Sequence, residues 1–106
     1  MKINITPSND KGQPDRYWEY YYDNGQLEYK GNYINGSKDG LWEWYYNNGQ
    51  LAFKGNYING KVDGYWEWYY YDGQPYSKGF YINGQEGGLW ELYCHNGKVE
   101  SKQYHI

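Results

Sequence analysis

Four glutamates at a regular spacing are the residues of this sequence that come closest to a catalytic pattern. They stand 24 residues apart, at Glu19, Glu43, Glu67 and Glu91. If each holds the same place in a repeated pair of β-strands, neighbouring carboxylates lie about 9.5 Å apart, near the separation found in inverting glycosidases. A lysine follows each glutamate by eleven residues, however. A carboxylate in an exposed ion pair lacks the raised pKa and the enclosed pocket that acid catalysis needs, so we interpret the row as structural.

Cys94 and His95 are adjacent and could supply a nucleophile or a metal ligand. In the 24-residue frame, however, Cys94 takes a position that other copies fill with tyrosine, and His95 takes a turn position. His105 is the only other histidine, so no metal-binding set can be assembled. A single cysteine cannot form an internal disulfide. We therefore predict no catalytic residue, no metal and no cofactor.

Tryptophan repeats with the same period as glutamate, at Trp18, Trp42, Trp66 and Trp90. A short fixed period indicates one supersecondary unit copied along the chain, in which each copy buries surface against its neighbours. In the unit that begins at Leu41, residues 41–46 and 51–58 have strand character. Residues 59–64 turn the chain back into the next unit. Frequent glycines and the lack of a 3.6-residue apolar period argue against helix.

The Asn48-Gly49 pair predicts the register of the two strands. Asn-Gly is typical of a two-residue hairpin loop in which both residues have positive φ. Such a loop places Glu43 opposite Lys54 and Trp42 opposite Gly55. The other units give the same Glu–Lys match, at Glu19–Lys30, Glu67–Lys78 and Glu91–Lys102. We expect the Trp42 ring to lie across Gly55, since an aromatic ring can cover backbone that carries no side chain.

Alternation along these strands predicts two different faces. One face is aromatic and holds Trp42, Trp44, Tyr46, Leu51, Phe53 and Tyr57. The other is charged, with tyrosines at intervals, and holds Glu43, Tyr45, Ala52, Lys54, Asn56 and Ile58. The expected fold is all-β: a single-layer, twisted antiparallel meander of about eight strands, roughly 35–40 Å wide, that can curl into an open half-barrel.

The composition limits the kinds of partner. Net charge is −3 with no basic block, so the sequence lacks the attraction that nucleic acid and anionic membranes usually need. No stretch resembles a signal peptide or could span a bilayer, which predicts a cytoplasmic protein without membrane insertion. We expect a polar N-terminal segment over residues 1–11 and one repeat domain over 12–106. Its units span about 17–40, 41–64, 65–88 and 89–106.

The stretch from Phe53 to Gly64 resembles a MORN repeat, whose pattern is aromatic-x-Gly-x-aromatic-x-x-Gly-x-x-x-Gly. Residues 29–40 match this pattern fully, residues 77–88 match it except at Ser77, and residues 101–106 look like a degenerate copy with Gln103 in place of glycine. The Tyr-Tyr-x-Asn-Gly-Gln-Leu and Asp-Gly-x-Trp-Glu-Trp-Tyr-Tyr phrases resemble the variant bacterial form, often described as antitoxin or immunity-type. The resemblance implies a single-layer antiparallel sheet, often paired with a second copy or a partner.

The aromatic face has three interpretations. It is a half-core covered by curvature, by residues 1–11 or by a second copy; or it docks a protein; or it stacks sugars or nucleobases. Exposed aromatic patches usually mark interaction sites. We predict a non-enzymatic module that binds a protein, or itself as a homo-oligomer, and that inhibits a bacterial toxin or defence-type effector by occlusion. A carbohydrate-binding or nucleobase-stacking platform and a purely structural scaffold are the alternatives.

The residues predicted to bind the partner are Trp42, Trp44, Tyr46, Phe53, Tyr57, Trp66, Trp68 and Tyr70. Trp44 and Trp68 are the most informative pair, because Tyr20 and Leu92 stand at equivalent positions. Replacing both by leucine is expected to leave the melting temperature nearly unchanged and to weaken binding. If the aromatic face is only a half-core, the search for the binding surface moves to the charged face and to three predicted loops. These are Lys38-Asp39, Val62-Asp63 and Glu86-Gly87.

Overall fold

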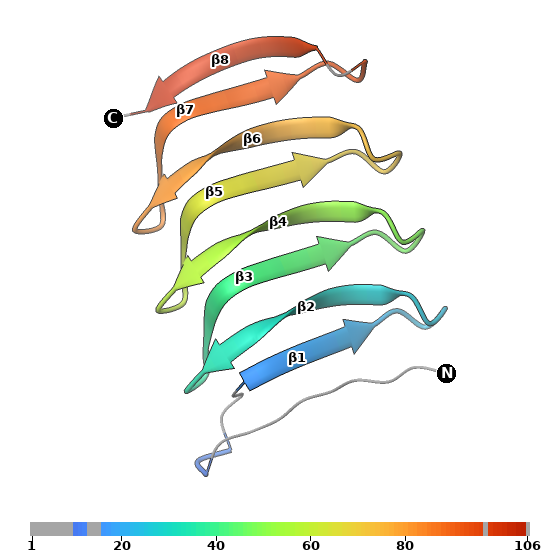
Figure 1. Ribbon diagram of the computed structural model, residues 1–106, viewed down its shortest axis with the longest axis vertical. Coiled ribbons are helices and arrows are strands. Elements are labelled where there is room, and N and C mark those ends of the chain that lie inside the picture. Colours follow the sequence, from blue (N-terminus) through green and yellow to red (C-terminus); the bar gives the residue numbers. More distant parts are fainter. Residues whose placement is uncertain (1–9, 13–15, 97, 106) are drawn as a thin grey trace.

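The protein is an all-β meander, as expected from the sequence. The computed structural model describes residues 10–12, 16–96 and 98–105. The strands are β1 (Arg16–Tyr21), β2 (Leu27–Ile34), β3 (Ser37–Tyr45), β4 (Leu51–Ile58), β5 (Lys61–Tyr69), β6 (Pro75–Ile82), β7 (Gln85–Tyr93) and β8 (Val99–His105). They pair antiparallel in chain order to form one eight-stranded sheet (Figure 1). The predicted N-terminal segment, and any cover it gives the sheet, falls mainly on residues 1–9, outside the described residues.

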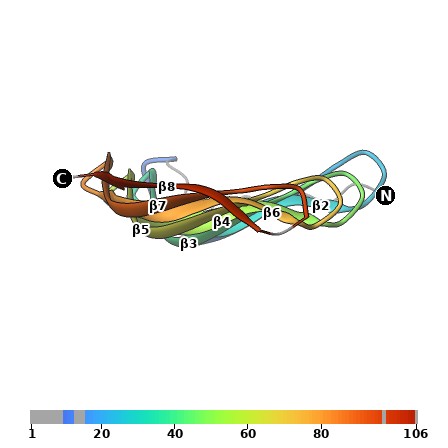
Figure 2. The ribbon, with the colours of Figure 1, turned by 90° about the horizontal axis from the view of Figure 1, so that it is seen from above.

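The sheet is a single open layer. Its principal extents are 46 × 34 × 11 Å, and it twists without closing, so β1 and β8 remain as edges (Figure 2). Among the described residues all regular structure is strand, and no helix is long and apolar enough to cross a membrane. A sheet one layer thick has no second layer to bury side chains against. Burial therefore has to come from rings that lie flat on the sheet.

The sheet has two kinds of turn. The two-residue turn lies at Asn59-Gly60, whereas the sequence predicted it at Asn48-Gly49. Asn59 and Gly60 have φ values of 51° and 81° and join β4 directly to β5, as a type I′ turn does. In the predicted loop only Gly49 has positive φ, at 89°. The Gly49 N–H donates to the Tyr46 carbonyl, and the Tyr46 N–H donates to the Gln50 carbonyl. This loop therefore has three residues, with the glycine in the left-handed region.

A β-bulge restores the predicted register. The three-residue loop places Leu51 opposite Tyr45, one residue away from the predicted pairing. Ala52 then has no partner, and beyond it Glu43 faces Lys54 as expected. The same shift occurs in every unit. The predicted Glu–Lys partners are therefore confirmed, although the loop differs. The assignment of Leu51 to the aromatic face is wrong, because directly opposed residues share a face and Tyr45 lies on the charged one.

Glutamate and lysine alternate without a break across all eight strands, and we call this line of side chains the charge row. Lys30, Lys54 and Lys78 are each paired in register with a glutamate on both neighbouring strands. Lys102, on the outer strand β8, is paired with Glu91. Glu67 is the clearest case: its carboxylate lies 3.5 Å from the Lys54 Nζ and 3.4 Å from the Lys78 Nζ. Each interior carboxylate thus has a cation on either side, which explains the regular spacing without catalysis.

Reversing one interior charge of this row should destabilise the sheet. Glu67→Lys places three ammonium groups on adjacent strands and is expected to lower the free energy of unfolding by about 1–2 kcal/mol, because each direct pair contributes up to about 1 kcal/mol. Urea unfolding measures the loss, and added salt should reduce it. Lys102→Glu on β8 is the matched control, because its carboxylate would face Glu91 alone at a more exposed site. If the two variants lost equal stability, an interior charge of the row would not be interacting with both neighbouring strands, and the prediction would be wrong.

The tryptophans lean the opposite way from the prediction. Trp42 is paired in register with Gly55, as expected. A Cβ on Gly55 would nevertheless fall within the ring of Trp66, from the following unit, while the Trp42 ring lies over Gly31 of the preceding one. The same holds for Trp90 and Gly79.

A wide irregularity between β2 and β3 explains the direction of these rings. The pairing jumps from Lys30–Glu43 to Asn32–Asp39, so residues 40–42 lie opposite Gly31 alone. Such a bulge re-aims a side chain. The Trp42 indole Nε1 donates to the Asn32 carbonyl at 2.9 Å, which fixes the ring over the glycine. The Trp42 and Trp66 side chains are 0% and 3% exposed, and they form the core of this single-layer sheet.

Candidate functional site

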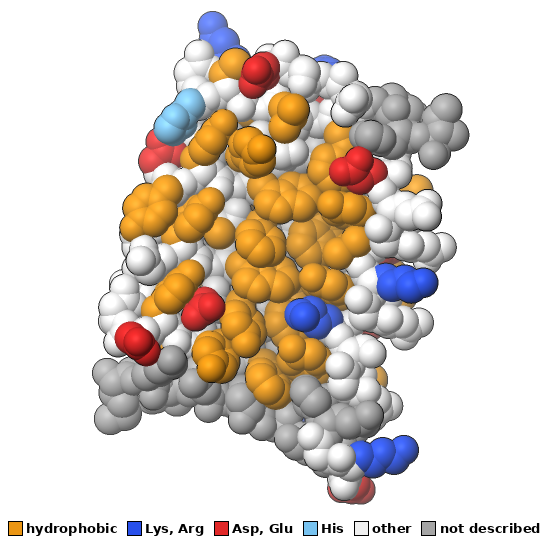
Figure 3. All heavy atoms as spheres, turned by 180° about the vertical axis from the view of Figure 1, so that it is seen from behind, with side chains coloured by type: hydrophobic (Ala, Val, Ile, Leu, Met, Phe, Trp, Pro, Cys, Tyr) orange, Lys and Arg blue, Asp and Glu red, His pale blue; other side chains and the backbone are white. Residues whose placement is uncertain are grey.

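Aromatic side chains form one connected set across the middle of the sheet, which we call the aromatic face. Five indoles follow one another from β3 to β7 with ring centroids 5.4–6.1 Å apart. They are Trp42, Trp44, Trp66, Trp68 and Trp90. Tyr57 and Tyr81 stand edge-on to these rings, at 5.3 Å from Trp66 and 5.1 Å from Trp90. Figure 3 shows the result as a continuous hydrophobic patch with charged groups around it.

The eight residues predicted to bind a partner lie on this face in three different situations. Trp42 and Trp66 are buried beneath their neighbours. The side chains that cover them are half-buried and reach the surface: Trp44, Phe53, Tyr57 and Trp68. Tyr46 and Tyr70 lie at the turn end, where the Tyr46 hydroxyl donates to the Tyr69 carbonyl at 2.6 Å and Tyr70 stacks on His95. The structure thus brings the eight together, and their role in binding remains a prediction.

Lys38 is a cation on the aromatic face that the sequence treated as part of a loop. It lies in β3 opposite Tyr33. Its Nζ lies 5.8 Å from the ring centroid of Tyr33, 5.3 Å from that of Trp42 and 5.6 Å from that of Tyr57. Val62 and Glu86 occupy the same place in the next two units, opposite Tyr57 and Tyr81. Lysine, valine and glutamate thus follow one another at a spacing of 24 residues in the sequence. Only the strand pairing shows that this position lies on the aromatic face.

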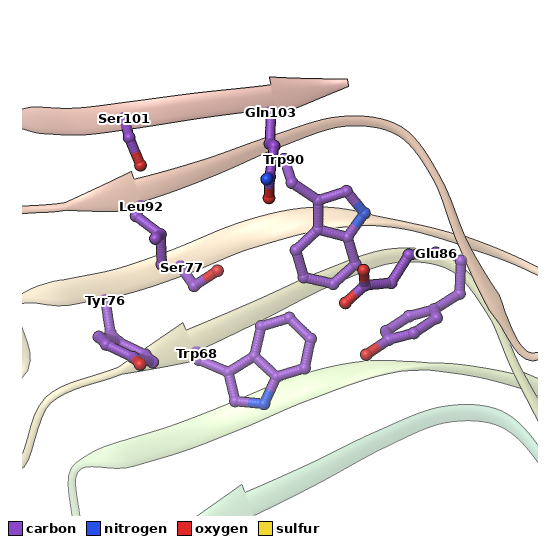
Figure 4. A pocket seen from close by; sticks show the side chains of 9 residues that line it. Trp68, Tyr76, Ser77, Glu86, Trp90, Leu92, Ser101 and Gln103 are labelled. Carbon is purple, nitrogen blue, oxygen red and sulfur yellow. The ribbon is translucent and has the colours of Figure 1, made fainter. Parts of the chain in front are cut away.

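A hollow interrupts the aromatic face between β5 and β8. Its volume is about 310 Å³, and its walls are Trp68, Tyr76, Ser77, Tyr81, Glu86, Trp90, Leu92, Ser101 and Gln103. The indoles of Trp68 and Trp90 and the carboxylate of Glu86 converge on it (Figure 4). Ser77 stands where the two preceding units have Phe53 and Tyr29, and Phe53 stacks on Trp44 at 4.5 Å. The hollow is therefore the space of a missing ring.

The model of the MORN repeat variant family matches residues 17–35, 38–59 and 62–83. The chain belongs to this family. The three matches cover three consecutive copies of the hairpin and its connection, and they agree with the 24-residue period. MORN repeats are generally binding or structural modules.

Solved structures support the fold of this MORN protein. The crystal structure of TarM aligns with 98% of the chain at a TM-score of 0.51 and 14% identity. The chain spans 21% of the TarM chain, so the similarity concerns one portion of TarM and shows the fold alone. No curated protein sequence matches the chain.

In the MORN sheet, the side chain of His95, next to Cys94 in the chain, pairs with a carboxylate of another turn. The His95 Nε2 lies 2.5 Å from the Asp72 Oδ2 in the turn of the preceding unit. The backbone N–H of Gln74 and the His95 ring hold the pKa of the Asp72 carboxyl below its usual range. His95 therefore links two successive turns. Within the described residues, no three His, Cys, Asp or Glu side chains come together as a metal site would require.

Tyrosines beside the charge row of this MORN sheet hold their protons strongly. Burial, and then the nearby Glu67 carboxylate, raises the pKa of Tyr69 to about 12. Burial, and then a hydrogen bond to Glu91, raises the pKa of Tyr93 to about 12. The pKa of Tyr17 is raised as well, by burial and by its hydrogen bond to Glu19.

The raised pKa values predict alkaline unfolding. Phenols in an unfolded chain ionise near pH 10. Between about pH 10 and 12 the unfolded state therefore loses protons that the folded state keeps, and stability falls as pH rises. Circular dichroism and phenolate absorbance should show ionisation and loss of the sheet together. Tyr69→Phe removes one raised group and should lessen the loss of stability over this range. Ionisation of Tyr69 or Tyr93 near pH 10 in an intact sheet, followed residue by residue by nuclear magnetic resonance, would contradict the prediction.

Proposed function

We propose that this protein is a non-enzymatic binding module whose aromatic face docks a protein partner. The observation that carries this proposal is the uncovered aromatic patch over β3–β7: no other layer of the described chain lies on it. Contiguous exposed apolar surface on this scale usually marks an interaction site. Tryptophan and tyrosine are also the side chains that most often contribute binding energy at interfaces.

Six of the eight predicted contact residues then divide into two roles. Trp44, Phe53, Tyr57 and Trp68 reach the surface and would touch the partner. Trp42 and Trp66 lie beneath them and hold them in place. A sheet of 46 by 34 Å offers more than the roughly 800 Å² per partner of a standard interface. Because the sheet is broad and only one layer thick, it would act by covering its partner. A bacterial toxin or defence-type effector is the partner class that the resemblance to the variant form suggests.

The two phenylalanines of the chain provide a matched test. Phe53 lies on the aromatic face, stacked on Trp44. Phe80 lies on the charged face, 45% exposed and beside Tyr65. Replacing each in turn by a photo-crosslinking phenylalanine analogue should give a specific protein adduct in cells of the source organism from position 53 and not from position 80. Adducts from position 80 alone would move the docking surface to the charged face.

The alternatives predict different outcomes. A carbohydrate platform would bind members of a glycan array and would lose that binding when Trp44 and Trp68 are replaced. A purely structural scaffold would give neither glycan binding nor a specific adduct at position 53. These two measurements separate the three functions even while the partner is unidentified.

A further inference from the structure

The hollow between β5 and β8 combines aromatic rings with one negative charge. Trp68, Tyr76, Tyr81 and Trp90 supply the rings, and Glu86 supplies the carboxylate. Aromatic faces attract cations because of their quadrupole, and the attraction is significant when the cation lies within about 6 Å of the ring centroid. A neighbouring carboxylate adds a direct charge interaction.

The first unit of the sheet shows how such a group is held. There the ammonium of Lys38 lies 5.3–5.8 Å from three ring centroids, those of Tyr33, Trp42 and Tyr57. The equivalent rings two units later are Tyr81 and Trp90, which pack edge-to-face at 5.1 Å just as Tyr33 and Trp42 do at 5.0 Å. Two of the three ring positions around Lys38 therefore recur beside the hollow, where Glu86 takes the place of Lys38 and His105 that of Tyr57.

Two substitutions in the repeat make room at this place. Ser77 stands opposite Trp68 and Leu92, where an aromatic ring stands in the earlier units. Leu92 itself takes the position of Trp44 and Trp68. The space of about 310 Å³ that results is at the lower end of the range for small-ligand sites. It is large enough for the end of one long side chain.

We propose that this hollow binds an alkylammonium or guanidinium group, held between the Trp68 and Trp90 rings and the Glu86 carboxylate. In the cell the group is the side chain of a lysine or arginine on the protein partner. That source rests on the proposed function, whereas the affinity of the hollow for the cation does not. The residue at this place thus differs along the aromatic face: a lysine stands at one end and a glutamate at the other.

Nuclear magnetic resonance with small probes tests the hollow without the partner. N-acetyl-arginine amide and tetramethylammonium should shift the indole N–H signals of Trp68 and Trp90. N-acetyl-citrulline amide, the neutral analogue of the arginine probe, should not. Equal shifts with the citrulline probe or with a neutral sugar, or no shift with either cation, would overturn the proposal. A response to tetramethylammonium without one to the arginine probe would assign the site to small quaternary amines and overturn the side-chain source.

Two variants and a matched control locate the binding. Glu86→Gln should weaken binding of the arginine probe by about tenfold, since an interaction with a charged group is lost. Ser77→Phe restores the residue type of the preceding unit and should fill the hollow. It should abolish the shifts while leaving the fold intact, because Phe53 already packs in this way. Glu28→Gln on β2 removes an equal charge far from the hollow and should change nothing. Unchanged probe binding in Ser77→Phe would overturn the assignment.

The same variants separate this proposal from the docking function. If crosslinking at position 53 captures a protein and Ser77→Phe reduces that capture, the partner supplies the cation. If capture is unchanged while probe binding is lost, the docking function holds and the partner is not the source. If the probes bind but position 53 captures nothing, the cation site holds without the docking function.

Discussion

Adding a single methyl group to Gly55 is expected to lower the free energy of unfolding by at least about 3 kcal/mol. Glycine-to-alanine replacements in a strand normally stabilise, because alanine restricts the unfolded chain and favours extended backbone. Here the new Cβ would fall within the Trp66 indole. That ring is 3% exposed and is held by a hydrogen bond to the Asn56 carbonyl, so it cannot move aside without loss. Urea unfolding of Gly55→Ala, and of the larger Gly55→Val, measures the cost.

The chain contains its own control for this experiment. Gln103 occupies the equivalent position in β8, and among the described strands none pairs with β8 on its other side to bring a tryptophan over it. Gln103→Ala should therefore be nearly neutral. Combining Gly55→Ala with Trp66→Leu should cost less than the sum of the two single changes, because the second removes the ring with which the first collides. Additive costs would show that the two residues do not meet.

Replacing Trp44 and Trp68 together by leucine is expected to weaken partner binding by several kcal/mol, as the loss of two hot-spot rings does. The sequence alone predicted a nearly unchanged melting temperature. The packing changes that expectation, because Trp44 stacks on Phe53 at 4.5 Å and lies 6.1 Å from Trp66. We now expect a modest loss of about 1 kcal/mol per ring, with the fold retained. Leu92 shows that the sheet accepts leucine at this place.

A variant of the opposite face controls for the loss of aromatic area. Tyr65 and Phe80 form an exposed pair on the charged face, with ring centroids 5.1 Å apart. Changing both to leucine removes two rings without touching the aromatic face, and binding should be unaffected. Affinity for the partner captured at position 53 is the measurement. Equal weakening by the two double variants would mean that general stability, and not the aromatic face, determines binding.

The fold could be predicted because its period, its Glu–Lys spacing and its aromatic alternation point to one register. The loop could not. Asn48-Gly49 resembles a two-residue turn, and only the unpaired Ala52 reveals that a longer loop and a bulge compensate each other. The sequence also could not predict over which glycine each tryptophan ring lies. Trp42 has a glycine on each neighbouring strand, Gly31 and Gly55, and the bulge opposite Gly31 decides between them.

The sequence could predict which rings share the aromatic face. It could not predict which of them are buried or which charged residues lie among them. Alternation places Trp44, Phe53 and Trp68 together without showing that Trp42 and Trp66 lie beneath them. The sequence did not place Lys38 and Glu86 on the aromatic face, because residues 35–40 and their equivalents look like loop sequence. In the structure β3 already begins at Ser37, after a turn of two residues. Strand pairing is needed to see that these charges lie among the rings.

Trp42, Trp66 and Trp90 each lean toward the preceding unit, and this gives the sheet a direction. A glycine such as Gly79 is covered only when the following 24 residues supply Trp90. The chain leaves the ribosome N-terminus first. The glycine of each unit would therefore stay uncovered until the next unit has been synthesised and has paired with it. Removing a later unit therefore uncovers the glycine backbone of the unit before it. Growth by duplication at the C-terminal end leaves all earlier contacts in place.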